Sequence, residues 1–171
     1  MPQSSGDLAQ LGFLLGRAYY SYIGFLERRL AAADLDRYVK PGMGSLLFAL
    51  FRQDDRTITE LGRELQLAKS TMTGMVARAK KTGLVTLQSD KVDRRAVRVR
   101  LTALARTLEP RCRRTADGVE DDLCAAFPGD ESEKLRSMLT TLNRVLVDEV
   151  QQSAAAQVKS AGRRPKVKSR K

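Results

Sequence analysis

Histidine is absent from the 171 residues of this chain, and cysteine occurs only twice, as Cys112 and Cys124. The lack of histidine excludes histidine-based catalytic triads and general bases, and two cysteines supply too few ligands for a zinc site. Two cysteines are also too few for a disulfide scaffold and are typical of the reducing cytosol. We therefore predict a cytoplasmic protein that is not an enzyme and that uses no cofactor or metal.

Long apolar runs and secretory signals are lacking as well. The nearest approach to a membrane span is residues 8–26, where Arg17 is the only charged side chain and Gln10, Ser21 and three tyrosines interrupt the apolar run. An arginine in the middle of a bilayer costs roughly 2.5–3.5 kcal/mol. The first seven residues contain no basic segment of the kind that opens a secretory signal. We expect no contact with a membrane.

Positive charge is abundant and unevenly distributed. Lysine and arginine number 31 against 20 acidic residues, which gives a net charge of +11. Residues 52–114 carry 16 basic and 7 acidic groups, residues 115–158 carry 3 and 9, and residues 159–171 carry 7 and none. A solvated excess spread over the whole surface would not produce this segregation. The pattern predicts a central nucleic-acid-binding module, an acidic segment and a basic tail.

Apolar spacing of three and four residues predicts helices at both ends of the chain. One covers residues 7–33, and the last has an apolar stripe from Leu135 to Leu146. Between them, residues 45–51 predict a short buried helix, and Thr102 is a predicted N-cap for a helix that runs towards Phe127.

A helix-turn-helix motif is predicted in the basic segment. Thr57 and Glu60 have the spacing of a capping box and predict a helix that continues to Leu65. After a turn at residues 66–68, the spacing of the apolar residues predicts a second helix over residues 69–81, with one buried face: Met72, Met75, Val76 and Ala79. Two short helices joined by such a turn are typical of this motif.

A β-hairpin is predicted after the second helix. Residues 84–87 form one strand, and residues 96–101 form another, with Val97, Val99 and Leu101 inward and Arg98 and Arg100 outward. The charged residues 88–95 form the loop, or wing. Because a major groove admits a helix and a minor groove admits an arginine, we predict that both elements contact DNA. The candidate contacts are Lys69, Ser70, Thr71, Thr73, Arg78, Lys91, Arg94 and Arg95.

Several motifs in this segment recur in one known family. They are Glu60-Leu61, Lys69-Ser70-Thr71-Met72-Thr73, Lys81-Thr82-Gly83-Leu84-Val85, and Asp93-Arg94-Arg95 followed by Leu101-Thr102. In this respect residues 57–102 resemble the winged-helix core of the MarR (multiple antibiotic resistance) transcription regulators. With the long first helix and the last two helices in matching order, the resemblance covers roughly residues 7–150.

The resemblance implies an obligate homodimer that binds a pseudo-palindromic operator in double-stranded DNA and that a small, often aromatic, ligand releases. It implies that Arg95 enters the minor groove with Asp93 as its orienting partner, and that the hydroxyl residues after Lys69 face the major groove. Three positions depart from the pattern. Gly74 stands where many relatives have arginine, and Gln66 and Ala105 stand where glycine is common. The first departure weakens the expected reading of the major groove.

We therefore predict a mainly α fold with a small β-hairpin wing. Residues 41–101 form the winged helix-turn-helix DNA-binding domain, residues 7–40 and 102–151 the helical dimerisation region, and residues 152–171 a disordered basic tail. The tail either attracts DNA without sequence preference or only aids solubility. In isolation the terminal apolar stripes fit an intrachain core better than a dimer seam, and the resemblance reverses that preference.

Alternatives remain at the level of function. The leading hypothesis is a ligand-responsive repressor, and the second is an architectural DNA-binding protein with little sequence preference. Five aromatic residues are candidates for lining an effector pocket, although such residues are more often core: Tyr19, Tyr20, Tyr22, Phe48 and Phe51. An intrachain pair of Cys112 and Cys124 is disfavoured, because residues 12 apart lie about 120° apart around a helix. The resemblance also disfavours a redox role for either residue, since the sensing cysteine of the family usually lies near the N-terminus.

Overall fold

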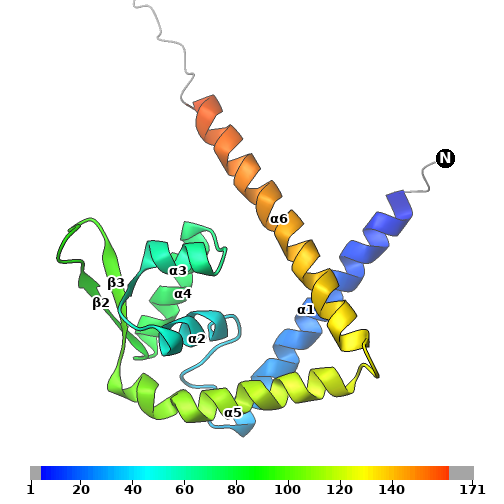
Figure 1. Ribbon diagram of the computed structural model, residues 1–171, viewed down its shortest axis with the longest axis horizontal. Helices are drawn as coiled ribbons and strands as arrows, with labels where there is room; N and C mark the ends of the chain where they lie inside the picture. Colours follow the sequence, from blue (N-terminus) through cyan, green and yellow to red (C-terminus); the bar gives the residue numbers. More distant parts are fainter. Residues whose placement is uncertain (1–4, 162–171) are drawn as a thin grey trace, which may run out of the picture. The chain divides into compact units, whose positions relative to one another are not determined.

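The computed structural model describes residues 5–161 of the chain, with side chains for residues 10–149. This part of the chain contains six helices and one small antiparallel sheet, which confirms the predicted fold class (Figure 1). The elements are α1 (Ser5–Ala32), α2 (Gly44–Arg52), β1 (Arg56–Thr57), α3 (Ile58–Glu64), α4 (Lys69–Lys81), β2 (Val85–Ser89), β3 (Val97–Leu101), α5 (Ala103–Ala125) and α6 (Glu131–Ala161).

The chain divides into two compact units, residues 1–122 and residues 123–171. The first unit contains α1, the winged helix and most of α5, and the second contains the end of α5 and α6. No helix in the described residues is long and apolar enough to cross a membrane.

The sheet has the strand order β1-β3-β2, and both pairings are antiparallel. In the β2–β3 hairpin Val85 pairs with Leu101, and Ser89 pairs with Val97. Arg56 of β1 pairs with Val99 on the other side of β3. The sequence did not predict β1, because two residues are too few to show the alternation that marks a strand.

The core of the first unit lies between α2, α3, α4 and the sheet. Leu46, Leu50 and Leu61 are almost completely buried. The face of α4 predicted to be buried is buried. Each of its four residues is at most 5% exposed: Met72, Met75, Val76 and Ala79. The prediction for Val97 is wrong, since 37% of this residue is exposed. It pairs with Ser89 at the end of the hairpin next to the loop, whereas the buried residues of β3 lie nearer α5.

Local signals fix the ends of the two short helices. The Thr57 hydroxyl accepts a hydrogen bond from the Glu60 amide at 3.2 Å, and the Glu60 carboxylate accepts one from the Thr57 amide at 2.7 Å. The predicted capping box is therefore confirmed. Gly83 follows α4 with φ of +75°, which glycine adopts without strain. Gln66 has φ of +53° in the turn before α4, so a glycine would also be unstrained there.

The last helix is longer than predicted. A tail was expected from residue 152, but α6 continues to Ala161. Three consecutive alanines, residues 154–156, lie in this stretch, and alanine has the highest helix propensity of all residues. The remaining residues of the predicted basic tail, 162–171, lie outside the described part of the chain.

Candidate nucleic-acid interface

The exposed face of α4 carries the polar residues predicted to contact DNA. Lys69, Ser70, Thr71, Thr73 and Arg78 are all exposed, because the opposite face packs into the core. The Thr73 hydroxyl donates to the Lys69 carbonyl at 2.7 Å, so its oxygen remains available as an acceptor. No side chain caps the N-terminus of α4, and no acidic residue lies in its first turn. Amides at such a terminus favour an anion such as phosphate.

The wing is the loop between β2 and β3, and two carboxylates fold it. Asp90 Oδ1 accepts hydrogen bonds from the Val92 and Asp93 amides at 2.8 and 2.9 Å. Asp93 Oδ1 accepts one from the Arg95 amide at 2.9 Å. The resemblance implied that Asp93 orients Arg95, and the contact observed is to the backbone of Arg95. Lys91, Arg94 and Arg95 are exposed on this loop.

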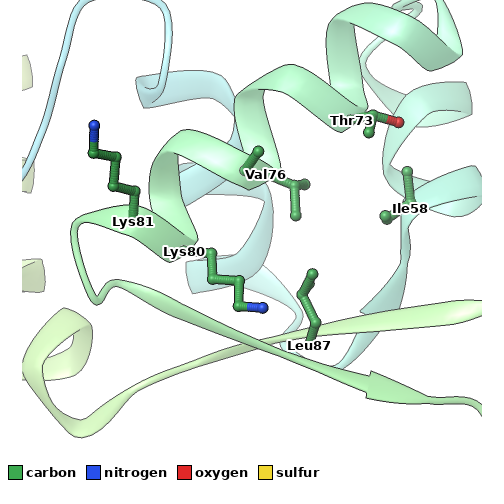
Figure 2. Close-up of a pocket in the computed structure, with 7 residues that line it drawn as sticks. Ile58, Thr73, Val76, Lys80, Lys81 and Leu87 are labelled. Carbon is green, nitrogen blue, oxygen red and sulfur yellow. The ribbon is translucent and has the colours of Figure 1, made fainter.

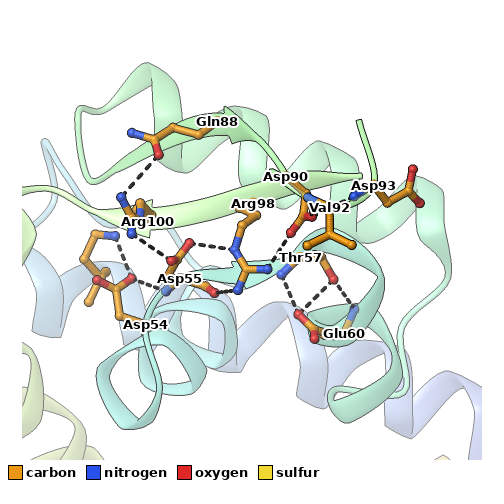
Figure 3. A network of polar contacts seen from close by, with 11 residues as sticks. Asp54, Asp55, Thr57, Glu60, Gln88, Asp90, Val92, Asp93, Arg98 and Arg100 are labelled. Carbon is orange, nitrogen blue, oxygen red and sulfur yellow. Dashed lines mark hydrogen bonds and ion pairs between the residues drawn. The ribbon is translucent and has the colours of Figure 1, made fainter. Parts of the chain in front are cut away.

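A network of ion pairs holds the base of the wing (Figure 3). The half-buried Arg98 donates through Nε to Asp55 Oδ1 at 2.8 Å and through Nη1 to Asp90 Oδ2 at 2.6 Å. Arg100 Nη2 donates to Asp55 Oδ2 at 2.8 Å. The hydrogen bond from the Asp93 amide, followed by that from Arg98, lowers the pKa of Asp90 from 3.8 to about 2. Hydrogen bonds from Arg100 and Arg98 lower the pKa of Asp55.

Arg98 and Arg100 lie on the face of β3 opposite the buried Val99 and Leu101, as the alternation predicted. Both guanidinium groups also bind carboxylates, because the segment between α2 and β1 places Asp55 against β3. The neighbouring Asp54 accepts from the Leu101 amide at 2.9 Å and from Arg106 of α5 at 2.5 Å. Sequence reasoning missed both aspartates. The available signal was an adjacent acidic pair just before the capping box.

Ion pairing separates the cations at the base of the hairpin from those of α4 and the wing. Arg52, Arg56, Arg98, Arg100 and Arg106 each bind a carboxylate. Seven cationic side chains of α4 and the wing form neither an ion pair nor a hydrogen bond within the described residues. They are Lys69, Arg78, Lys80, Lys81, Lys91, Arg94 and Arg95. These seven residues are called the unpaired cations below. All are exposed, so uncompensated positive charge lies on α4 and the wing.

A shallow hollow of about 450 Å³ lies between α4 and β2. It is lined by Ile58, Thr73, Val76, Ala77, Lys80, Lys81 and Leu87. Figure 2 shows Lys80 reaching towards Leu87, while the ammonium group of Lys81 points away. The hollow is thus mainly apolar, with cationic side chains at the C-terminal end of α4.

The five aromatic residues proposed for an effector pocket fall into two groups. Tyr19, Tyr20 and Tyr22 are exposed on α1. Phe48 and Phe51 of α2 pack edge to face, with ring centroids 5.8 Å apart, and Arg113 lies over both rings. None of them lines the hollow beside α4 or a second one of about 250 Å³ at the end of α1. The effector pocket therefore stays a prediction.

The cysteines lie apart in the structure. Cys112 is a buried core residue of α5, and burial raises the pKa of its thiol, which disfavours the reactive thiolate. Cys124 lies near the end of α5, with its sulfur 3.9 Å from Arg136 Nη2.

Comparison with known proteins finds a similarity in the winged helix. Residues 44–96, from the start of α2 to the end of the wing, match the model of the MarR family. This segment of the chain is similar to the MarR family. Members of the family are transcription regulators that bind DNA, and they are not enzymes. No curated protein matches the chain in a sequence comparison.

Solved structures of transcription regulators share this fold over most of their length. The DNA-bound transcriptional repressor CouR is 25% identical, with a TM-score of 0.66 over 84% of this chain and 99% of CouR. A MarR regulator from Methanosarcina mazei Go1 is 21% identical, with a TM-score of 0.63 over 82% and 98% of the two chains. An organohalide-sensing regulator in its 2,4-dichlorophenol-bound form is 18% identical, with a TM-score of 0.70 over 86% and 88%.

Replacement of Asp90 tests how the wing is held. Asp90→Ala removes the acceptor for the Val92 and Asp93 amides, so both should exchange hydrogen faster in native-state exchange, whereas Lys91→Ala should leave them protected. The lowered pKa of Asp90 means that its contribution is present above pH 3.8 and is lost as pH falls through about 2. Protection of the two amides should fall over the same range. Equal exchange in Asp90→Ala and the parent protein would contradict this account.

Proposed function

We propose that this protein is a homodimeric repressor of the MarR family that binds a pseudo-palindromic operator and that a small ligand releases. The observation that carries the proposal is that α4 and the wing carry the seven unpaired cations, while the neighbouring Arg98, Arg100 and Arg106 bind carboxylates. Positive side chains without internal partners are available to neutralise phosphates, a major source of affinity for DNA. As a regulator of DNA it would act in the cytoplasm.

The proposed contacts follow from the two exposed elements. Lys69, Ser70, Thr71, Thr73 and Arg78 of α4 would contact the major groove and its phosphates. Lys91, Arg94 and Arg95 of the wing would contact the minor groove and the adjacent backbone, with Asp93 holding the loop at Arg95. In a two-fold dimer the two copies of α4 would lie about 34 Å apart, on half-sites about 10 base pairs apart.

Exposed apolar side chains support a dimer. Large hydrophobic residues on the N-terminal half of α1 are 37–76% exposed, and those on α6 are 48–68% exposed. They are Leu11, Phe13, Leu14, Leu15, Tyr19 and Tyr20 on α1, and Met138, Leu139, Val145 and Leu146 on α6. Apolar faces of this extent mark protein interfaces. We propose residues 7–40 and 102–151 as the dimerisation region and residues 41–101 as the DNA-binding domain.

The proposal for release is supported by the organohalide-sensing regulator, which has this fold and a bound dichlorophenol. The aromatic residues of α1 and α2, Tyr19, Tyr20, Tyr22, Phe48 and Phe51, are our candidates for the contacts with such a ligand.

Footprinting on DNA from the region that flanks the coding gene tests the function. The parent protein should protect one discrete pseudo-palindrome at concentrations that leave the surrounding DNA unprotected. Uniform protection, with equal affinity for random duplexes, would instead support an architectural protein and overturn the repressor.

Arg95→Ala should weaken binding to the protected site by about 1–3 kcal/mol, because it removes the cation at the tip of the wing. Arg114→Ala is the matched control, since it removes an exposed arginine from α5 and should change affinity little. Fluorescence anisotropy at one fixed salt concentration gives both dissociation constants. If the two variants bind equally well, the proposed role of Arg95 is wrong.

Leu139→Glu should break the dimer. Leu139 lies on the apolar face of α6 and is 48% exposed, and a symmetric interface would bury the new carboxylate twice. We expect the dimer dissociation constant to rise roughly 100-fold or more, with a parallel loss of DNA binding. Ser137→Glu, an exposed position on the opposite side of the same helix, is the control. Analytical ultracentrifugation measures both, and a stable Leu139→Glu dimer would exclude this face from the interface.

A further inference from the structure

The middle of the exposed face of α4 is occupied by small side chains. Ser70, Gly74 and Ala77 are spaced so that they lie along one side of the helix, opposite the buried residues. Gly74 lies at the centre of this side and has no side chain that could reach the bases. The helix backbone is correspondingly less covered at this point.

Arg78 fills the space that Gly74 leaves. A Cβ placed on Gly74 would lie 3.7 Å from Nη1 of Arg78, so the guanidinium group lies back along the helix over the glycine. Positions 74 and 78 are one helical turn apart, and side chains in a helix incline towards its N-terminus. The guanidinium group of Arg78 is therefore carried over the helix backbone at Gly74.

The guanidinium group of Arg78 also forms no ion pair or hydrogen bond within the described residues. It is one of the unpaired cations, whereas Arg98, Arg100 and Arg106 are fixed by Asp54, Asp55 and Asp90. All five of its N–H donors remain available to a ligand.

We propose that Arg78 is the residue of this chain that determines specificity in the major groove, and that it reads a guanine at one fixed position of each half-site. The inference rests on the proposed function. A guanidinium group binds guanine O6 and N7 through two parallel hydrogen bonds, which is the commonest specific contact between proteins and DNA. Gly74 permits this contact, because a long side chain there would displace the guanidinium group.

Selection from a randomised duplex pool tests the proposal. The selecting proteins are the full-length parent chain, Arg78→Ala, Arg78→Lys, Gly74→Ala and Gly74→Leu. Gly74→Ala is the matched control, because a methyl group 3.7 Å from Nη1 is in ordinary van der Waals contact and leaves the guanidinium group in place. Circular dichroism establishes that each variant is folded.

The parent and Gly74→Ala should enrich one palindrome with a guanine at a fixed position of each half-site. Arg78→Ala and Gly74→Leu should enrich the same palindrome with that position degenerate. Arg78→Lys should also lose the guanine while keeping the salt dependence of binding, because it retains the charge without the planar pair of donors. Replacing the guanine in the parent's consensus duplex should weaken binding by the parent protein roughly 10- to 100-fold. The same replacement should weaken binding by Arg78→Lys far less.

Two results would overturn the proposal, and they are distinguishable. If the parent enriches a palindrome and both Arg78 variants keep every base preference, Arg78 does not read a base, while the proposed function stands. If the parent enriches no discrete site, the proposed function fails and this inference fails with it.

Discussion

The wing depends on the guanidinium group of Arg98, which is held between Asp55 and Asp90. Exposed ion pairs contribute about 0–1 kcal/mol each, less than the roughly 1.5–3 kcal/mol for burial of one leucine side chain. Buried residues such as Leu61 therefore stabilise the fold, while the ion pairs of Arg98 orient β3 and the wing. A planar guanidinium group donates hydrogen bonds only in fixed directions, so its two carboxylate partners restrict how β3 and the wing lie against the segment after α2.

The same network decides which charges are available to DNA. Some of the basic residues between positions 52 and 114 are arginines that form ion pairs within the protein. The net charge of the segment does not distinguish these arginines from the cations that are available to a ligand. Asp54 and Asp55 neutralise guanidinium groups at the base of the hairpin and at the start of α5. The seven unpaired cations on α4 and the wing have no such partner, so the positive charge that this surface presents follows from ion pairing as well as from sequence.

Much of the winged helix could be predicted, because its signals are local. The bounds of α4 follow from its apolar period and Gly83, and the start of α3 follows from Thr57 and Glu60. Features set by contacts between distant segments could not be predicted in this way. β1 is recognised only by its pairing with β3, and the exposure of Val97 depends on where the covering helices end. The role of Arg98 depends on a carboxylate 43 residues away in sequence. The polar face of α4 was predictable from periodicity. The position of Arg78 over Gly74 was not, because it depends on the conformation of a long side chain.

Abundant unpaired charge makes selectivity the harder requirement for this protein. Contacts to phosphates raise affinity for every sequence, so discrimination must come from the few side chains that reach base edges. The hydroxyl residues at the start of α4 are short, and the Thr73 hydroxyl already donates to the helix backbone. An arginine is long enough to cross the distance and has two parallel donors. A glycine one turn earlier lets that arginine lie along the helix and lets the helix approach the DNA closely. In this chain the loss of a side chain at position 74 is thus compatible with selective binding, provided that position 78 remains arginine.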